Sequence, residues 1–205
     1  WEIWNATLLP TNPEDYASFQ IFSGPALSPP VIADLDRDGA PEVIAADGEG
    51  SLHAFRVTLG PHIAGDPPVL YVMVAELPGW PTPALGRGRL SEVSLGDLER
   101  DGYPEVFHTG GECRIAAFHY SGSPRSGFPL AAADALAPAD SSGVWPPIVA
   151  DVDGDLILDV IPVLPDGSRP AYRSDGHRIA GFGELGSTGA GAPPILADLD
   201  GDGTM

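Results

Sequence analysis

Asp34-Leu35-Asp36-Arg37-Asp38-Gly39-Ala40-Pro41-Glu42 places carboxylates at positions 1, 3, 5 and 9 of a nine-residue loop. The same spacing starts again at Asp97, Asp151 and Asp198, although the last copy has no position 9. Carboxylates held this close repel one another and raise one another's pKa values unless a cation lies among them. Ca²⁺ fits such a loop because it takes about 6–8 oxygen ligands from carboxylates, backbone carbonyls and water. The four loops therefore predict calcium sites.

Each predicted site takes the side chains at positions 1, 3, 5 and 9 and the backbone carbonyl at position 7. The predicted metal ligands are Asp34, Asp36, Asp38, Ala40 and Glu42; Asp97, Glu99, Asp101, Tyr103 and Glu105; Asp151, Asp153, Asp155, Ile157 and Asp159; and Asp198, Asp200, Asp202 and Thr204. A glycine after position 5 permits the sharp bend that brings the carboxylates together. Leu156 replaces that glycine in the third loop, a departure that bears on the affinity of that site.

An EF-hand is the main alternative calcium loop, and the sequence excludes it. An EF-hand needs a glutamate at loop position 12 and a helix on each side. Position 12 is Ala45, His108 or Pro162 in the first three loops. The flanking segments, Val-Ile-Ala before the first loop and Glu-Val-Ile-Ala after position 8, are typical of strands. The loops are therefore predicted to lie in β-hairpins.

Composition and charge limit the class of protein. The 205 residues include 26 glycines and 23 prolines, yet 43% are hydrophobic, which favours a folded chain of short strands and turns. The net charge is −19, and fifteen of the 29 acidic residues lie in the four loops. So acidic a chain repels nucleic acid and anionic membrane surfaces. No apolar run approaches the roughly 20 residues of a membrane span, so membrane insertion is not expected.

The loops recur at the period of a known repeat architecture. They begin at residues 34, 97, 151 and 198, so their spacings are 63, 54 and 47 residues. A repeat of about 50 residues with four short strands is typical of β-propeller blades. The predicted fold is all-β, with about three and a half four-stranded antiparallel blades of a β-propeller and calcium loops in the hairpins. Within this single domain, 1–28 ends a preceding blade, 29–91, 92–145 and 146–192 are repeats, and 193–205 starts a fourth.

Hydrophobic patterning predicts the individual strands. The predicted strands cover residues 1–5, 19–22, 30–33, 42–46, 51–57, 69–77, 90–95, 105–108, 114–119, 145–150, 159–163, 169–172, 177–182 and 192–197. Gly79-Trp80-Pro81 and Gly127-Phe128-Pro129 close the first two units. Residues 131–140 are a small-residue insertion, predicted as loop or one helical turn.

These residues resemble those of FG-GAP/VCBS repeats, the blades of integrin-α-type β-propellers and of many secreted bacterial proteins. The resemblance rests on the acidic loops, their outgoing Glu-Val or Asp-Val strands, and Phe182-Gly183 followed by Gly191-Ala192-Pro193. It covers about residues 28–205. It implies structural calcium sites joining strands within a blade, and a propeller of seven blades, so that this chain is a segment of a longer chain or one repeat unit of an assembly.

The function expected is that of a non-catalytic calcium-binding module of a secreted or cell-surface protein, with a structural or adhesive role. Sites of this kind often have a Kd of about 10⁻⁴–10⁻³ M, which suits extracellular calcium. The expected partner is a protein or glycan, and exposed blade edges allow self-association. Two alternatives stay open: the scaffold of a secreted hydrolase or polysaccharide lyase, and the repeat unit of an extracellular fibre.

Other motifs carry less weight. The segment 181–186 matches G-x-G-x-x-G, but the residues after it will not form the helix of a dinucleotide site. The five histidines form no recognised zinc motif, and no G-x-S-x-G is present. Trp4, Trp80 and Trp145 could stack on sugars, although packing within or between blades is the simpler role. No catalytic residue is predicted, and the lone Cys113 excludes an intrachain disulfide.

Overall fold

The regular elements are all short β-strands in the part of the chain that the structure, a computed structural model, describes. That part comprises residues 7–9, 29–47, 49–59, 70–84, 92–109, 114–131, 145–163 and 169–182. The strands are β1 (Thr7–Leu9), β2 (Val31–Ala33), β3 (Glu42–Ala46), β4 (Leu52–Leu59), β5 (Leu70–Glu76), β6 (Ser94–Gly96), β7 (Glu105–Thr109), β8 (Arg114–Phe118), β9 (Leu130–Ala131), β10 (Ile148–Ala150) and β11 (Asp159–Ile161). The predicted all-β class is thus confirmed for the described residues.

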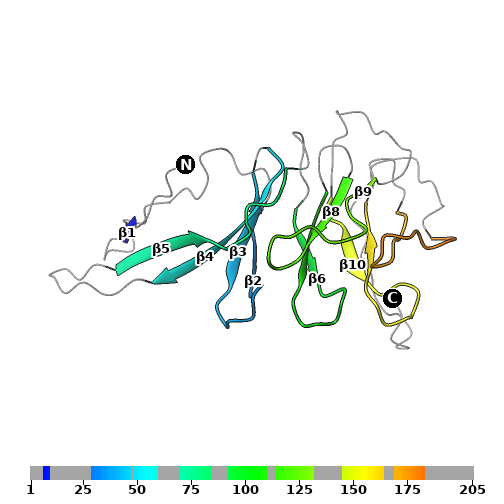
Figure 1. The fold of residues 1–205 in the computed structure, drawn as a ribbon, viewed down its shortest axis with the longest axis horizontal. Coiled ribbons are helices and arrows are strands. Elements are labelled where there is room, and N and C mark those ends of the chain that lie inside the picture. The colour runs from blue at the N-terminus through cyan, green and yellow to red at the C-terminus, as the bar shows by residue number, and fades with distance from the viewer. Residues whose placement is uncertain are drawn as a thin grey trace.

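The strands form three antiparallel sheets that follow one another along the molecule (Figure 1). The first sheet has the order β1-β5-β4-β3-β2, the second β6-β7-β8-β9 and the third β10-β11. We call these sheets, with their loops, the first, second and third units. The hairpins β2–β3, β6–β7 and β10–β11 each contain one acidic loop, as the flanking strand patterns predict.

Most predicted strands inside the described residues are present, but two in the third unit are not. The segments 169–172 and 177–182 form only the isolated bridges Val160–Tyr172 and Tyr172–Arg178. Pro170 has no N–H with which to extend a ladder, and Arg173 N–H donates to the His177 carbonyl, so the chain already turns there. The predicted strands 1–5, 19–22 and 192–197, residues 132–140 of the insertion, and the fourth loop lie outside the described residues.

Two of the three hydrophobic core clusters lie between units, and the third lies within the third unit around Ile161 and Ala171. The first core cluster joins Ile44 and Leu52 of the first sheet to Val106 and Phe118 of the second. The second cluster joins Phe107, Ile115 and Ala117 of the second sheet to Val160 of the third. A small sheet cannot bury both of its faces alone, so each unit is stabilised by stacking on its neighbour.

Turns also dock one unit onto the next. Gly79 and Gly127 both have positive φ angles, of 90° and 84°, and each precedes a residue whose peptide bond to proline is cis. A Cβ at Gly79 would lie 2.1 Å from the Ser121 carbonyl oxygen, and one at Gly127 would lie 2.6 Å from the Asp175 carbonyl oxygen. The backbones of neighbouring units therefore approach at two glycines where a side chain would collide.

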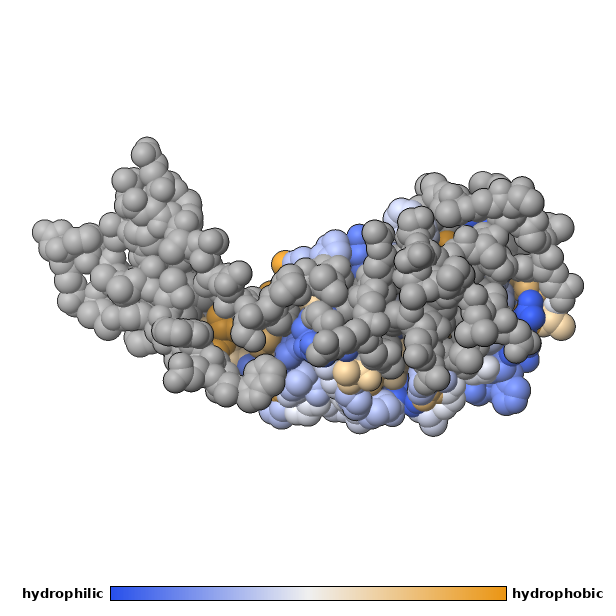
Figure 2. Space-filling model, turned by 90° about the horizontal axis from the view of Figure 1, so that it is seen from above, coloured by the Kyte–Doolittle hydropathy of each residue, from blue (hydrophilic) through white to orange (hydrophobic). Residues whose placement is uncertain are grey.

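Viewed from above, the described residues in sight are largely hydrophilic, with separate hydrophobic patches (Figure 2). The exposed large hydrophobic residues of the described part come from different elements. They are Ile32 in β2, Met73 in β5, Tyr120 after β8, and Leu156 and Ile157 in the third loop. None of the described residues forms a helix long and apolar enough to cross a membrane.

Candidate metal centres

The three described acidic loops share one backbone conformation. The φ angles at positions 4 and 6 are 59° and 89° in the first loop, 56° and 88° in the second, and 79° and 68° in the third. Position 6 is glycine in the first two loops, whereas the third carries Gly154 at position 4 and Leu156 at position 6. Leu156 thus adopts the left-handed bend, and the missing glycine does not change the path of the loop.

Backbone N–H groups orient the carboxylates within each loop. The N–H at position 6 donates to the carboxylate at position 1, over 3.0, 2.8 and 2.8 Å in the three loops. The N–H at position 7 donates to the carboxylate at position 5, over 2.8 Å in all three. Each of these bonds uses one carboxylate oxygen and so fixes the direction of the other.

The acid at position 9 is buried in every described loop. Glu42, Glu105 and Asp159 are 0, 2 and 1% exposed. One oxygen of each accepts the N–H at position 2, over 2.9, 2.8 and 3.0 Å. In the third loop the other oxygen, Asp159 Oδ1, is buried and has no hydrogen-bond partner. An unpaired buried carboxylate oxygen is costly, and a cation bound beside it would remove that cost.

The pKa values of two of these buried acids are raised in the folded chain. Burial raises the pKa of Asp159, the Val152 N–H opposes that effect, and the neighbouring Asp153, Asp155 and Asp151 add to it. Burial also raises the pKa of Glu105 against the Leu98 N–H and the Arg125 charge. In these two loops burial therefore disfavours the charged form of the acid at position 9 more than its hydrogen bond and neighbouring cations favour it.

Among the described residues, three groups of side chains bring ligand atoms within 4.8 Å of one another. Two of them unite positions 1, 3 and 9 of a loop: Asp34, Asp36 and Glu42, and Asp151, Asp153 and Asp159. The third unites Glu99 and Glu105 with His119, which lies outside the loop. The remaining predicted ligands of these loops, including Asp97 and the acids at position 5, are in none of the three groups. The predicted ligands of the fourth loop (Asp198, Asp200, Asp202 and Thr204) lie outside the described residues.

A basic residue lies across the hairpin from each buried acid, and sequence reasoning missed it. Glu42 pairs with Arg56 on β4, and the same register places His119 and Arg173 opposite Glu105 and Asp159. In all three units the basic residue follows the acid by 14 positions. That constant spacing was the available signal, but it joins residues of different strands and is not part of the loop motif.

The two arginines act as counter-cations. Arg56 bonds to Asp36 and to Glu42 Oε1, with Nε at 3.2 Å from that oxygen, and its Nη2 lies 2.9 Å from Asp38 Oδ2. Arg173 donates to Asp153 Oδ2 over 3.1 and 2.6 Å, and this pairing lowers the pKa of Asp153. A guanidinium neutralises carboxylates but cannot ligate a metal, because it has no lone pair to offer.

In the second unit the guanidinium comes from a different place. Arg125, 8% exposed, bonds to Glu99 Oε1, and its Nη1 lies 3.7 Å from Glu105 Oε1. It follows β8 in the turn toward the third unit and also donates to the Ser174 carbonyl over 3.5 Å. His119 therefore occupies, in the second unit, the position that holds arginine in the other two units.

The donor sets differ accordingly between the loops. The first and third offer carboxylate oxygens alone, which is the ligand chemistry of Ca²⁺. The second adds an imidazole nitrogen. All three groups are therefore fit to hold a cation that ties the loop to the outgoing strand, and the oxygen-only groups fit the predicted calcium.

Comparisons with known proteins give one likeness to report. No protein-family model matches the sequence, and no curated protein matches it. Among solved structures, the crystal structure of the V. cholerae biofilm matrix protein Bap1 is similar, with 17% sequence identity and a TM-score of 0.33. The match covers 73% of this chain and 27% of the Bap1 chain. The chain thus spans about a quarter of the length of Bap1, and the metal centres are inferred from the loops themselves.

Proposed function

We propose that this chain is a non-catalytic calcium-binding repeat module, in which the ions fix the hairpins of successive β-propeller blades. The observation that carries the proposal is the buried, unpartnered Asp159 Oδ1 beside Asp151 and Asp153. Buried polar atoms normally have a partner. A divalent cation is a partner that all three converging carboxylates can share.

Calcium acts in this proposal through linkage to folding. The loop oxygens converge only when the hairpin is formed, so the ion binds the folded chain and not the unfolded one. At tenfold the Kd, one such site adds about 1.4 kcal/mol to the free energy of unfolding. Because two of the core clusters lie between units, a hairpin fixed in one unit also supports the sheet stacked on it.

The setting proposed is extracellular or at a cell surface. Loops with a Kd of about 10⁻⁴–10⁻³ M are roughly half to nine-tenths occupied at about 1 mM calcium and largely empty in a cytosol. The module then presents the loops and turns of its blades to a protein or glycan, in a structural or adhesive role. The resemblance to FG-GAP/VCBS repeats supports both the blade architecture and this setting.

The test is thermal unfolding in a chelator, in millimolar Ca²⁺ and in millimolar Mg²⁺. Calcium is expected to raise the Tm by several degrees, since about 1 kcal/mol shifts the Tm by roughly 2–4 °C in a chain of this size. Magnesium should do less, because it demands octahedral geometry and gives up its water reluctantly. The same Tm in chelator and in calcium would refute the proposal.

Asp159→Asn tests whether the third loop contributes to the rise in Tm that calcium causes. The amide can still accept the Val152 N–H, but it carries no charge. The variant is expected to be at least as stable as the wild type in chelator, because the buried charge is gone, and to lose part of the calcium-induced rise. Asp175→Asn is the control, since Asp175 is an exposed acid outside the loops. An unchanged calcium response in Asp159→Asn would remove the third site.

A further inference from the structure

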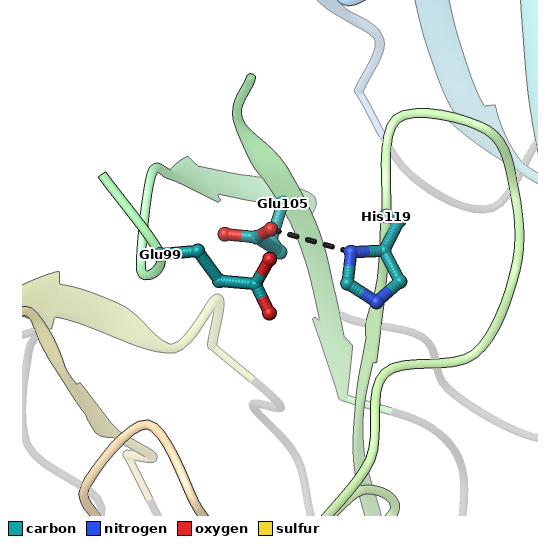
Figure 3. A group of neighbouring side chains, drawn as sticks. All are labelled: Glu99, Glu105 and His119. Atoms are coloured by element: carbon teal, nitrogen blue, oxygen red, sulfur yellow. Dashed lines mark ion pairs between the residues drawn. The ribbon is translucent and has the colours of Figure 1, made fainter. Parts of the chain in front are cut away.

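The second unit departs from the other two at two positions that meet in space. Position 3 is Glu99, where the first and third loops have aspartate, and the residue opposite position 9 is His119, where they have arginine. In Figure 3 both carboxylates and the His119 ring turn toward one another, and their ligand atoms lie within 4.8 Å. The longer side chain and the imidazole therefore contribute to the same group.

We propose that the second loop binds a divalent transition ion, with Zn²⁺ as the probe, through Glu99, Glu105 and His119, while the first and third loops take Ca²⁺. This rests on the proposed function only in that the second loop, too, holds a cation. It changes which ion that is, and it replaces an oxygen-only ligand set with one nitrogen and two oxygens.

The spacing of the ligand atoms supports a shared ion. His119 Nδ1 lies 3.5 Å from Glu105 Oε1, which is longer than the roughly 2.7–3.2 Å of an N–H···O hydrogen bond. Zinc binds nitrogen and carboxylate oxygen at about 2.0–2.2 Å, so two ligands of one tetrahedral ion lie roughly 3.4 Å apart. The observed separation is also that of a direct ion pair, and it is close to the spacing that two ligands of one ion require.

The chemistry of the donors selects the class of ion. Imidazole nitrogen suits zinc and its neighbours, whereas Ca²⁺ is a hard cation bound by oxygen. Arg56 and Arg173 occupy the equivalent position in the other units and cannot ligate any metal. Only the second unit, among the three that the structure describes, has a metal ligand at this position.

Surrounding groups hold the carboxylates in place for binding. The Leu98 N–H fixes Glu105 Oε2, so Glu105 Oε1 is the oxygen on the His119 side. Such outer contacts orient metal ligands and tune their affinity. Arg125 bonds to Glu99, and its Nη1 lies 3.7 Å from Glu105 Oε1, so an ion at this site shares the two carboxylates with a guanidinium, as in the first loop. The His119 side chain is 30% exposed, which leaves a path for an ion and for water to complete its coordination.

The experiment is a zinc titration of the protein in millimolar calcium, followed by calorimetry. One Zn²⁺ per chain is expected to bind through this site, and Co²⁺ in its place should give the absorption spectrum of an ion with a nitrogen ligand. His119→Arg places at this position the residue found in the other two units, where it adds a second guanidinium near Arg125. It should weaken Zn²⁺ binding by at least about tenfold, because loss of an outer-shell partner alone typically costs that much.

Two further variants, a control and a second test of the site, separate this site from incidental zinc binding. His177→Gln removes an exposed histidine whose Nδ1 lies 3.1 Å from Asp175 and should leave zinc affinity unchanged. Glu99→Asp shortens the side chain to that of the other loops and should weaken zinc binding. No zinc binding in the wild type, or equal binding in His119→Arg, overturns the inference.

Failure of the inference and failure of the proposed function are distinguishable in the same samples. If His119→Arg binds zinc as the wild type does while calcium still raises the Tm, the inference is wrong and the proposed function stands. If zinc binding depends on His119 but calcium leaves the Tm unchanged, the proposed function is wrong and the zinc site stands.

Discussion

Leu156 is held in a left-handed backbone conformation that residues other than glycine, asparagine and aspartate rarely adopt. Its φ is 68°, and its side chain is 61% exposed, so it gains little from packing. Left-handed strain costs roughly 1–2 kcal/mol. Leu156→Gly should remove this strain from the folded state. Glycine also makes the unfolded chain more flexible, which costs roughly 0.4–1 kcal/mol of the stability gained. We expect a net stabilisation of between about 0 and 1.6 kcal/mol in urea unfolding.

Ile157→Gly is the matched control for this prediction. Ile157 is the next residue, is also exposed, and is not among the residues with positive φ. It has no left-handed strain to relieve, so this change should only destabilise. Equal effects of the two substitutions would contradict the account of the loop backbone.

Asp47 closes the turn between β3 and β4 and should make stability depend on acid pH. Burial alone would raise the pKa of Asp47, but hydrogen bonds from the Ser51 N–H, His53 and the Glu49 N–H together lower it. A lowered pKa in the folded state gives stability that is present above the unfolded value of about 3.9 and is lost as pH falls through the folded value.

Asp47→Asn tests the direction of this pH dependence of stability. The variant cannot titrate, so the wild type should be more stable by about 1 kcal/mol between pH 5 and 6, and the gap should close as the pH falls below about 4. The measurement is the urea midpoint as a function of pH. A gap that widens in acid would show that the Asp47 pKa is raised instead.

At the scale of single residues, the sequence predicts the loop carboxylates better than the backbone conformation and the basic side chains around them. The alternating carboxylates are visible because loop neighbours in sequence are neighbours in space. The left-handed position 4 was missed, because Arg37 and Arg100 are residue types that seldom adopt it. Arg56, His119 and Arg173 were missed because register, not adjacency, brings them to the loop.

The hairpin is the element in which metal and arginine compete for the same carboxylates. Arg56 reaches Asp36, Asp38 and Glu42, two of which belong to a candidate ligand group. Arg56→Gln removes that competing charge. We expect lower stability in chelator, where the acids lose their counter-ion, and a several-fold tighter calcium site, on the order of 1 kcal/mol.

Calorimetric titration with calcium checks this result, with Arg178→Gln as the control. Arg178 is exposed and lies in the third unit away from the first loop, so its loss should leave both quantities close to the wild type. Weaker calcium binding in Arg56→Gln would mean that the guanidinium supports the site rather than competing with it.

At the scale of the element, a strand is predicted correctly where its hydrophobic pattern is regular. Residues 42–46 are a strand as predicted, because Glu-Val-Ile-Ala-Ala is apolar after its first residue and ends at an aspartate turn. In the third unit, 169–182 contains proline and a Ser-Asp-Gly turn. Propensity there supports bridges but not a ladder, and the pattern alone does not reveal that difference.

Stacking of whole units depends on the close backbone approach at glycine. Gly127 lies with φ 84° against the Asp175 carbonyl oxygen, whereas Gly181 has φ 80° and no atom within 4 Å of the place that a Cβ would take. Gly127→Ala and Gly181→Ala therefore carry the same backbone strain, and only the first adds a collision with backbone. We expect Gly127→Ala to cost at least about 1 kcal/mol more.

Chemical denaturation of the two variants measures that difference. A matched loss in both would show that the second and third units do not approach at this turn. The stacking itself was predictable from the repeat, because a small sheet needs a neighbour. The particular contact was not, because it depends on how far one turn reaches across the interface.

A high-resolution structure of crystals grown in millimolar calcium tests most directly the central claim, that the acidic loops bind calcium. The account predicts an ion beside Asp34, Asp36 and Glu42, and another beside Asp151, Asp153 and Asp159, with oxygens at about 2.3–2.6 Å. It also predicts that Asp159 Oδ1 ligates the second of these ions. Loops that hold no ion at that calcium concentration would contradict it.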